Sequence, residues 1–300
     1  MSAPSGRLVM VGTPIGNLED ISARAVRVLG ELSVVYCEDT RRTRSLYSAL
    51  GLKAPRLVRL DRHNETEMAE QVVACLALGS DVGLLSDAGM PTISDPGAAL
   101  VRRVSDAGFT VSVIPGPCSL SAALAVSGLP GDGHRFAGFL ARKGTDRTLA
   151  LAAIAASPVT TVVFEAANRV GRTTEDLASA CGPDRPFVWV RELTKIHEEV
   201  WRGTLGGAVR LFSREPQAGE LRQAEVELRG EWILMVGPAD TEADDSATPE
   251  QLAELLRRAL ADGTTRRDAV EEVVEATGAP RKAVYRIALD LDRPAAPKRA

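Results

Sequence analysis

The chain has 300 residues, of which 45% are hydrophobic and 4% aromatic, and its formal net charge at pH 7 is −4. This length favours two domains, or one domain with an appendage, with enough aliphatic material for a sizeable core. No apolar run approaches the roughly 20 residues of a membrane-spanning helix, and the first residues lack the basic and apolar segments of a secretion signal, so we expect a soluble, cytoplasmic protein. The four cysteines are widely spaced and only three histidines are present, which predicts free thiols and no metal site.

Short apolar runs alternate with helical patterns over the first 128 residues. The predicted strands lie at 8–12, 34–37, 57–60, 82–85 and 110–114. The predicted helices lie near 22–32, 41–50, 65–79, 96–107 and 119–127. This alternation predicts a parallel α/β sheet.

Three of these strands end in loops rich in small and polar residues. The loops begin at Gly12, Ser86 and Pro115. Because the carboxyl ends of parallel strands meet at one edge of the sheet, the three loops predict one shared pocket. Asp95 and Pro96 are expected to open the next helix as its N-cap and first residue. Cys118 is an alternative nucleophile in the third loop, but no histidine lies near it in the sequence.

The first loop resembles a nucleotide-binding glycine-rich turn only in part. Glu38 and Asp39 end the second predicted strand, about 20 residues further on, where a dinucleotide fold keeps its ribose-binding acid. Pro14 contradicts this interpretation, since a proline ring blocks the backbone and offers no N–H to a pyrophosphate. The loop therefore favours another ligand.

The chain after residue 128 changes character at a glycine-rich segment, 128–133, which predicts a hinge between domains 1–128 and 129–238. The expected strands are 136–140, 159–165, 187–192, 198–202, 224–229 and 232–236. Their close spacing predicts a mixed sheet, with a hairpin around Arg229–Glu231.

Residues 239–249 are acidic and small, which predicts a linker before a helical appendage at 250–300. Three capped helical patterns follow, at 249–260, 265–277 and 280–291. They predict a small bundle, either a nucleic-acid module of the helix-turn-helix type or a packing appendage.

Positive charge gathers in one segment of this mildly acidic chain. Residues 40–63 hold seven arginine and lysine residues against the single acidic Asp61. Arg41, Arg42 and Arg44 begin this segment directly after the second strand. A polyanion docking beside the pocket explains the cluster, because each neutralised phosphate releases counterions. A solvated helix face is the alternative.

Several motifs together carry a family resemblance that spans nearly the whole chain. They are 11–18 (VGTPIGNL), 38–41 (EDTR), 63–65 (HNE), 86–97, Phe164-Glu165 with Asn168-Arg169, 191–195 (RELTK) with 197–199, and Gly230-Glu231. The set resembles the tetrapyrrole-methylase superfamily, and within it the branch that 2′-O-methylates a cytidine of 16S ribosomal RNA in the small ribosomal subunit.

This resemblance implies an α/β fold with two α/β domains, a parallel sheet and then a mixed one, with a cleft between them for S-adenosyl-L-methionine. It also implies a homodimer and rRNA as partner. The cofactor contacts that it implies are Pro14, Asp87, Ala88, Gly89, Ile93 and Ser119, with Phe164 and 236–238 near the adenine.

A ribose hydroxyl is a poor acid, so the transfer needs a neutral lysine or a carboxylate close to it. We expect Lys195 to act on the 2′-hydroxyl, with Asp39 and Glu192 placing it. Arg41 and Arg169 are expected to hold phosphates, together with Arg42 and Arg44. For each of these residues an ordinary salt bridge is the alternative role.

Two other functions stay open from the sequence. A corrin-ring methylase would share the fold and the cofactor but would need neither the arginine cluster nor the C-terminal helices. A non-catalytic RNA-binding assembly factor would explain the basic segment but not the three ligand loops.

Overall fold

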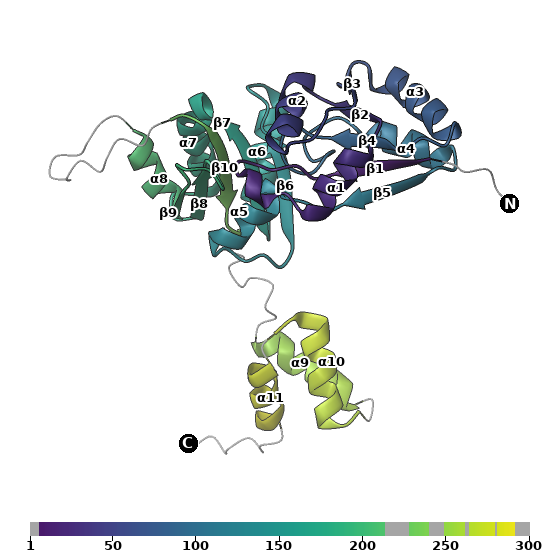
Figure 1. Ribbon diagram of the computed structural model, residues 1–300. Helices are drawn as coiled ribbons and strands as arrows, with labels where there is room; N and C mark the ends of the chain where they lie inside the picture. Colours follow the sequence, from purple (N-terminus) through teal and green to yellow (C-terminus); the bar gives the residue numbers. More distant parts are fainter. Residues whose placement is uncertain (1–5, 214–227, 240–248, 262–263, 280, 292–300) are drawn as a thin grey trace, which may run out of the picture. The chain divides into compact units, whose positions relative to one another are not determined.

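The computed structural model describes residues 6–213, 228–239, 249–261, 264–279 and 281–291. They belong to two compact units, Met1–Ala239 and Asp240–Ala300. Among the described residues, the first unit contains two five-stranded sheets and the second contains three helices (Figure 1). None of the described helices combines the length and the apolar character needed to cross a membrane.

The first sheet is parallel throughout, with strand order β3-β2-β4-β1-β5. Its strands are β1 (Arg7–Val11), β2 (Val34–Cys37), β3 (Arg56–Arg59), β4 (Val82–Leu85) and β5 (Thr110–Ile114). The connecting helices are η1 (Leu18–Asp20), α1 (Ala23–Glu31), α2 (Thr40–Ala49), α3 (Glu65–Ala77) and α4 (Ala98–Asp106). The predicted parallel α/β sheet is therefore confirmed.

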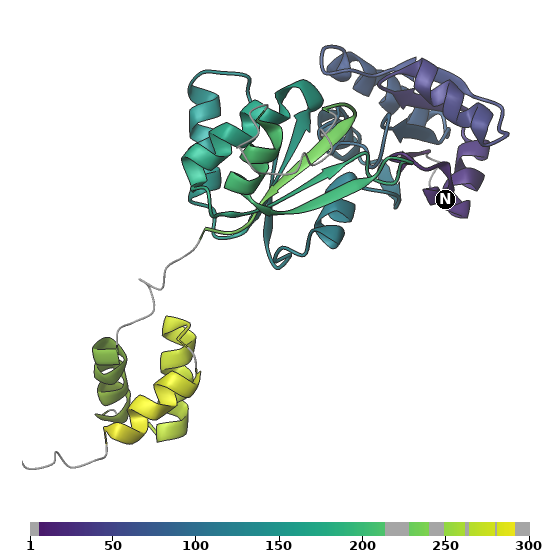
Figure 2. The same cartoon turned by 90° about the vertical axis from the view of Figure 1, so that its left-hand side faces the viewer.

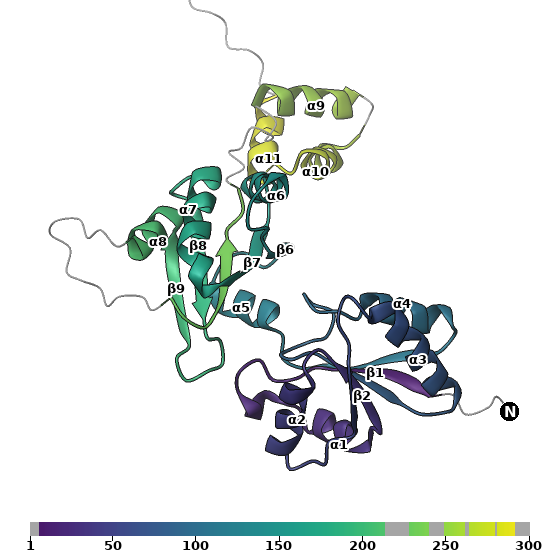
Figure 3. The ribbon, with the colours of Figure 1, turned by 90° about the horizontal axis from the view of Figure 1, so that it is seen from above.

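Helices cover both faces of this sheet. Leu8 and Met10 of β1 pack with residues of α3 and α4, whereas Val9 and Val11 pack with residues of α1 and α2. Successive strand residues point to opposite faces, so a strand buried on both sides has to be apolar at every position. Figure 3 shows the sheet between its two helix pairs.

The start of α4 differs from the prediction. Asp95 does not cap the helix; its N-cap is Gly97, with a φ of 130°. A carboxylate oxygen of Glu65 accepts hydrogen bonds from the backbone N–H groups of Gly97, Ala99 and Leu100, at 3.0, 2.7 and 3.1 Å. Glu65 thus satisfies the exposed N–H groups of α4 from the first turn of α3, which leaves Asp95 for the cleft.

α5 (Ser119–Ser127) follows the last strand of the first sheet in the chain but packs on the second sheet. Ala123 belongs to one buried cluster with Val162, Val190 and Met235 of the second sheet and with Ile15 from the loop after β1. Apolar contacts therefore join the two sheets within the first unit.

The second sheet, drawn in teal and green in Figure 2, is mixed, as predicted. Its strand order is β6-β7-β10-β8-β9. The β6–β7 pair is parallel and the other three pairs are antiparallel. Its strands are β6 (His134–Phe139), β7 (Thr160–Ala166), β8 (Pro186–Arg191), β9 (Glu199–Thr204) and β10 (Glu231–Val236). The helices of this half are α6 (Thr145–Ala155), η2 (Ala167–Arg169), α7 (Val170–Cys181) and α8 (Leu205–Phe212).

The hairpin predicted around Arg229–Glu231 is wrong. β10 lies between β7 and β8, so both of its edges already have partners. Residues 224–227 of the expected strand lie outside the described residues, and 228–229 are not in a strand.

The second unit consists of α9 (Pro249–Ala261), α10 (Arg266–Thr277) and α11 (Arg281–Asp290). Its core joins all three helices through Leu256, Val270 and Val284, among other residues. α10 ends at Gly278 in the left-handed conformation, with a φ of 66°, which turns the chain towards α11.

The loops after β1 and β5 approach each other closely at the backbone of two glycines. A Cβ atom on Gly12 would lie 2.7 Å from the Cα of Gly116, and one on Gly116 would lie 2.8 Å from the Cα of Gly12. The loop after β1 also pairs with the loop after β4, where Thr13 N–H donates to Gly89 at 3.0 Å and Gly89 N–H donates back at 3.1 Å. These contacts fix the three loops as one body.

We predict that Gly12→Ala lowers the free energy of unfolding by about 2 kcal/mol or more, because a backbone neighbour cannot rotate away from the added methyl group. Gly131→Ala is the matched control, since nothing lies within 4 Å of a Cβ atom there. Urea denaturation followed by circular dichroism measures both variants. Equal stability of the two variants would contradict the contact.

Candidate active site

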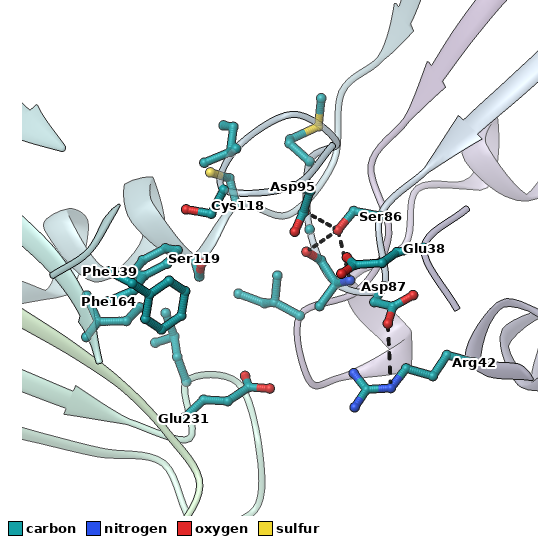
Figure 4. A pocket seen from close by; sticks show the side chains of 18 of the residues that line it. Glu38, Arg42, Ser86, Asp87, Asp95, Cys118, Ser119, Phe139, Phe164 and Glu231 are labelled. Carbon is teal, nitrogen blue, oxygen red and sulfur yellow. Dashed lines mark hydrogen bonds and ion pairs between the residues drawn. The ribbon is translucent and has the colours of Figure 1, made fainter. Parts of the chain in front are cut away.

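Loops of the first sheet and strand ends of the second line one cavity of about 870 Å³ (Figure 4). From the first sheet come the loops after β1, β2, β4 and β5; from the second come the ends of β6, β7, β8 and β10. The sequence-predicted residues that line it are Asp39, Arg41, Arg42, Asp87, Ala88, Gly89, Ile93, Ser119 and Phe164. The pocket predicted from the three strand-end loops is therefore present.

Asp87 joins the loops after β4 and β2. One carboxylate oxygen accepts the backbone N–H of Asp39 at 3.0 Å, and the other lies 3.7 Å from Nε of Arg42. The Asp87 side chain is 19% exposed. The Asp39 N–H and the Arg42 guanidinium thus hold the Asp87 carboxylate in position.

A second acidic group lies in the same loop. Asp95 accepts a hydrogen bond from Ser86 Oγ at 2.5 Å, and both residues line the cavity (Figure 4). Burial raises the pKa of Asp95, and the Asp87 carboxylate raises it further. The pKa of Glu38 is raised for the same reasons, first by burial and then by Asp95 and Asp87. Three carboxyl groups therefore crowd this wall and favour a ligand with a positive charge.

Two facing loops hold backbone conformations that L-residues rarely adopt. Among the described residues other than glycine, only Thr92, Ser94, Glu192 and Thr194 have a positive φ, of 72°, 72°, 49° and 65°. Each pair flanks an apolar residue that lines the cavity, Ile93 in the loop after β4 and Leu193 in the loop after β8. Strain of this kind persists where the surrounding structure holds the loop in one shape, which is typical of a binding site.

Lys195 lies between two carboxylates beside the cavity. Its ammonium is 2.9 Å from Glu192 and 3.2 Å from Glu231. The Glu192 oxygen also accepts the backbone N–H of Glu231 at 2.8 Å. Gly230 has a φ of 77°, which favours glycine, and a Cβ atom there would overlap the Glu192 side chain in this position. Glu231 lines the cavity, and its side chain is 68% exposed.

The charge state of Lys195 follows from this arrangement. Partial burial lowers its pKa, but the hydrogen bond to Glu192 and the interactions with Glu231 outweigh burial and raise the pKa above the ordinary value. The ammonium form therefore dominates at neutral pH, which suits a hydrogen-bond donor and not a proton acceptor. Glu231, and not the expected Asp39, is the second acid beside Lys195.

Asp39 and Arg41 form a local pair at the start of α2. Asp39 caps the helix by accepting the Arg41 N–H at 2.8 Å, and the Arg41 guanidinium reaches both of its oxygens, at 2.7 and 3.1 Å. The hydrogen bonds from Arg41 hold the pKa of Asp39 well below its usual range. Asp39 is consequently a fixed negative charge. Arg41 remains 87% exposed.

The remaining predicted residues lie outside the lining of the cavity: Pro14, Arg44, Arg169, Glu192, Lys195 and 236–238. Arg44 is exposed on α2. Arg169 is 22% exposed, lies 3.2 Å from the buried Glu165 and donates to the backbone oxygen of Leu140 at 2.7 Å. These bonds occupy Arg169 within the second sheet, which does not fit the expected phosphate contact.

The cavity is also lined by Glu231, Asp95 and Phe139, for which we predict no site role from the sequence, and by Arg59, which belongs to the basic segment 40–63. For Glu231 a signal was present, since Gly230-Glu231 immediately precedes an apolar strand. Arg59 and Phe139 end strands, yet their direction depends on the fold. No histidine lines this cavity, so a Cys118 nucleophile would have to do without an imidazole there.

Comparison with known proteins supplies the family. Residues 7–209 match the family described as Tetrapyrrole (Corrin/Porphyrin) Methylases, and residues 246–292 match the RsmI C-terminal HTH domain. The ribosomal RNA small subunit methyltransferase I of Xylella fastidiosa (strain Temecula1) is 41% identical over 286 residues, covering 95% of this chain and 99% of that protein. The protein of the same name from Synechocystis sp. is 37% identical over 287 residues, covering 96% and 99%. The chain belongs to the ribosomal RNA small subunit methyltransferase I family of the tetrapyrrole methylases.

Solved structures agree with this methylase on the fold. The uroporphyrin-III C-methyltransferase from Thermus thermophilus in complex with S-adenosylhomocysteine has a TM-score of 0.51 and 23% identity, covering 77% of this chain and 97% of that one. The cofactor of this methylase family is S-adenosylmethionine, and the chain is a methyltransferase.

We predict that Glu231→Gln lowers the pKa of Lys195, because it removes one of the two negative charges that stabilise the ammonium. The pH dependence of the reaction of Lys195 with an amine-specific reagent, followed by mass spectrometry, measures the shift. In Glu199→Gln, the matched control, the lost carboxylate pairs with Arg191 at 2.9 Å, so the Lys195 profile should stay in place. Identical profiles for both variants would contradict the proposed pairing.

Proposed function

We propose that this methylase transfers a methyl group from S-adenosylmethionine to the 2′-oxygen of a cytidine ribose in 16S ribosomal RNA of the small subunit. The observation that carries the proposal is the cavity itself, which Asp87, Ser119, Arg41 and Arg42 line together. It joins cofactor loops to an arginine-rich helix. The names of the relatives support rRNA as the acceptor.

Residues from both sheets fit this cofactor. S-adenosylmethionine, when bound, supplies an electrophilic methyl group on a positively charged sulfonium. The crowded carboxyl groups of Glu38, Asp87 and Asp95 favour positive charge, and Ile93 and Phe164 offer apolar surface suited to an adenine. We propose that Asp87, the backbone of Ala88 and Gly89, Ile93, Ser119 and Phe164 contact the cofactor. Pro14 would act through the loop that it stiffens.

Arginines on the first sheet fit the acceptor. Arg41, Arg42 and Arg59 line the cavity and are 87%, 67% and 70% exposed. Exposed guanidinium groups bind phosphate oxygens with paired N–H donors. We propose that these three residues and the neighbouring Arg44 hold the RNA backbone at the mouth of the cleft. Arg169 would instead keep Glu165 and β7 in position.

The second sheet offers groups for the proton of the ribose hydroxyl. The 2′-oxygen gains the methyl group and loses its proton, and its acidity rises only as the new bond forms. We propose that the Glu231 carboxylate accepts that proton and passes it to water. The Lys195 ammonium, fixed by Glu192, would stabilise negative charge developing on the oxygen. Lys195 and Glu192 thus stay in the proposed catalytic group, with Glu231 in the place expected for Asp39.

The decisive experiment is transfer of tritiated methyl from S-adenosylmethionine to small subunits that lack this modification, followed by mapping of the labelled nucleotide. We expect label at one ribose 2′-oxygen of 16S rRNA. Asp87→Asn is the negative control. We expect it to lose cofactor binding, and therefore transfer, because it weakens the contacts of Asp87 to Asp39 and Arg42. Label on a corrin and not on rRNA would overturn the acceptor, and cofactor binding without any transfer would favour a binding factor.

A charge reversal tests the RNA contacts separately. Arg41→Glu with Arg44→Glu should weaken small-subunit binding and flatten its salt dependence by about one slope unit for each lost phosphate contact. Cofactor affinity should stay unchanged. Arg27→Glu is the control, since Arg27 is 64% exposed on α1 and pairs with Glu31. A parallel loss of cofactor affinity would indicate misfolding of the cleft and not a lost RNA contact.

Two further expectations remain predictions. The homodimer and the cytoplasmic location rest on the sequence and the resemblance. The match of residues 246–292 to a helix-turn-helix domain supports a nucleic-acid role for the second unit over a packing role.

A further inference from the structure

An exposed aromatic ring stands in the wall that the second sheet contributes to the cavity. Phe139, the last residue of β6, is 60% exposed and lines the cavity (Figure 4). Leaving an aromatic ring in water forfeits the free energy of burying it. A ring so placed is suited to a planar ligand.

A bulge in β6 brings Phe139 to this position. The register of β6 on β7 shifts between Phe136 and Gly138, and Gly138 has a φ of 63°. Residues three apart in a regular strand point to opposite faces of the sheet. The extra residue of the bulge reverses this, so Phe136 and Phe139 both contact Phe164, with ring centroids 4.8 and 5.8 Å away. Bulges that redirect a side chain occur next to active sites.

The surroundings of Phe139 hold the ring and place it near the cofactor loops. Phe164 packs against it at an interplanar angle of 71°. A Cβ atom on Gly138 would lie 3.8 Å from Ser94 Oγ, so the bulge adjoins the strained loop after β4. The ring therefore stands where the second sheet meets the proposed cofactor loops.

We infer that Phe139 is the platform on which the base of the acceptor nucleotide stacks. This inference rests on the proposed function, because it takes the acceptor to be a ribonucleotide. The cavity of about 870 Å³ lies in the upper part of the range of roughly 300–1,000 Å³ for small-molecule sites, which leaves space for a nucleoside beside a cofactor. A nucleotide whose ribose reacts inside a cleft has to leave its neighbours, and an aromatic face replaces the lost stacking.

The test compares Phe139→Ala with wild type in the full-length protein, using small subunits as acceptor. Loss of a stacking partner should raise KM for the small subunit roughly ten- to a hundredfold. The Kd of S-adenosylmethionine, measured by calorimetry, should stay unchanged. Phe139→Trp should restore KM, since it keeps an aromatic face. Leu149→Ala, which shortens a 62% exposed side chain on α6, should behave as wild type.

A thermodynamic cycle that combines Phe139→Ala with removal of the acceptor base tests whether that base stacks on Phe139. Small subunits carrying an abasic ribose at the acceptor position keep the 2′-hydroxyl but lack the base. If Phe139 stacks on that base, the effects of Phe139→Ala and of base removal are not additive. Additive effects, an unchanged KM, or a weaker cofactor Kd in Phe139→Ala would each overturn the inference. An inactive wild type would refute the proposed function itself, which separates the two failures.

Discussion

The site depends on the apolar packing that joins the two sheets of the first unit. Ile15, from the loop after β1, is 7% exposed and buried among Val190, Leu193 and Ile233 of the second sheet. The next residue, Gly16, has no side chain, and a Cβ atom there would lie 2.5 Å from Cγ of Lys195. One strand-end loop therefore touches the cofactor loops on one side and the proposed catalytic lysine on the other. Because packed interiors transmit displacement, the distance between the two walls is set here.

Two groups of opposite charge on the first-sheet wall of the cleft suit a cationic donor and an anionic acceptor. Carboxyl groups gather behind the loop after β4, where burial and mutual repulsion raise the pKa values of Asp95 and Glu38. Arg41 and Arg42 on α2, and Arg59 at the end of β3, have exposed guanidinium groups. These groups form ion pairs with Asp39, Asp87 and Asp61 respectively. Such exposed pairs are weak, so phosphate oxygens can replace them at little cost. The arginines can thus exchange partners when RNA docks, while the acidic groups stay fixed.

Among the described residues other than glycine, positive φ values occur only in two loops beside this cleft. Thr92 and Ser94 on one wall, and Glu192 and Thr194 on the other, hold positive φ values. Specific bonds maintain these shapes: Arg62 donates to the Ser94 carbonyl at 3.2 Å, and Glu198 accepts the Thr194 N–H at 2.6 Å. A loop prepared in this way loses less entropy when ligand binds, which is how a rigid site gains affinity and geometric precision.

The sequence by itself determined the element types, the parallel and mixed sheets, the three converging loops and the family, because these follow from periodicity and from motifs local in the chain. Only the tertiary structure decided which side chains share a space. The capping of α4 by Glu65, the placing of Glu231 beside Lys195 and the central position of β10 all join residues more than 30 positions apart. Phe139 reaches the cleft through a bulge that shifts the alternation of its strand by one residue. Periodicity predicts which face of a regular strand each side chain occupies. It does not predict pairings between residues far apart in the sequence, or a bulge, which is defined by the register with a neighbouring strand.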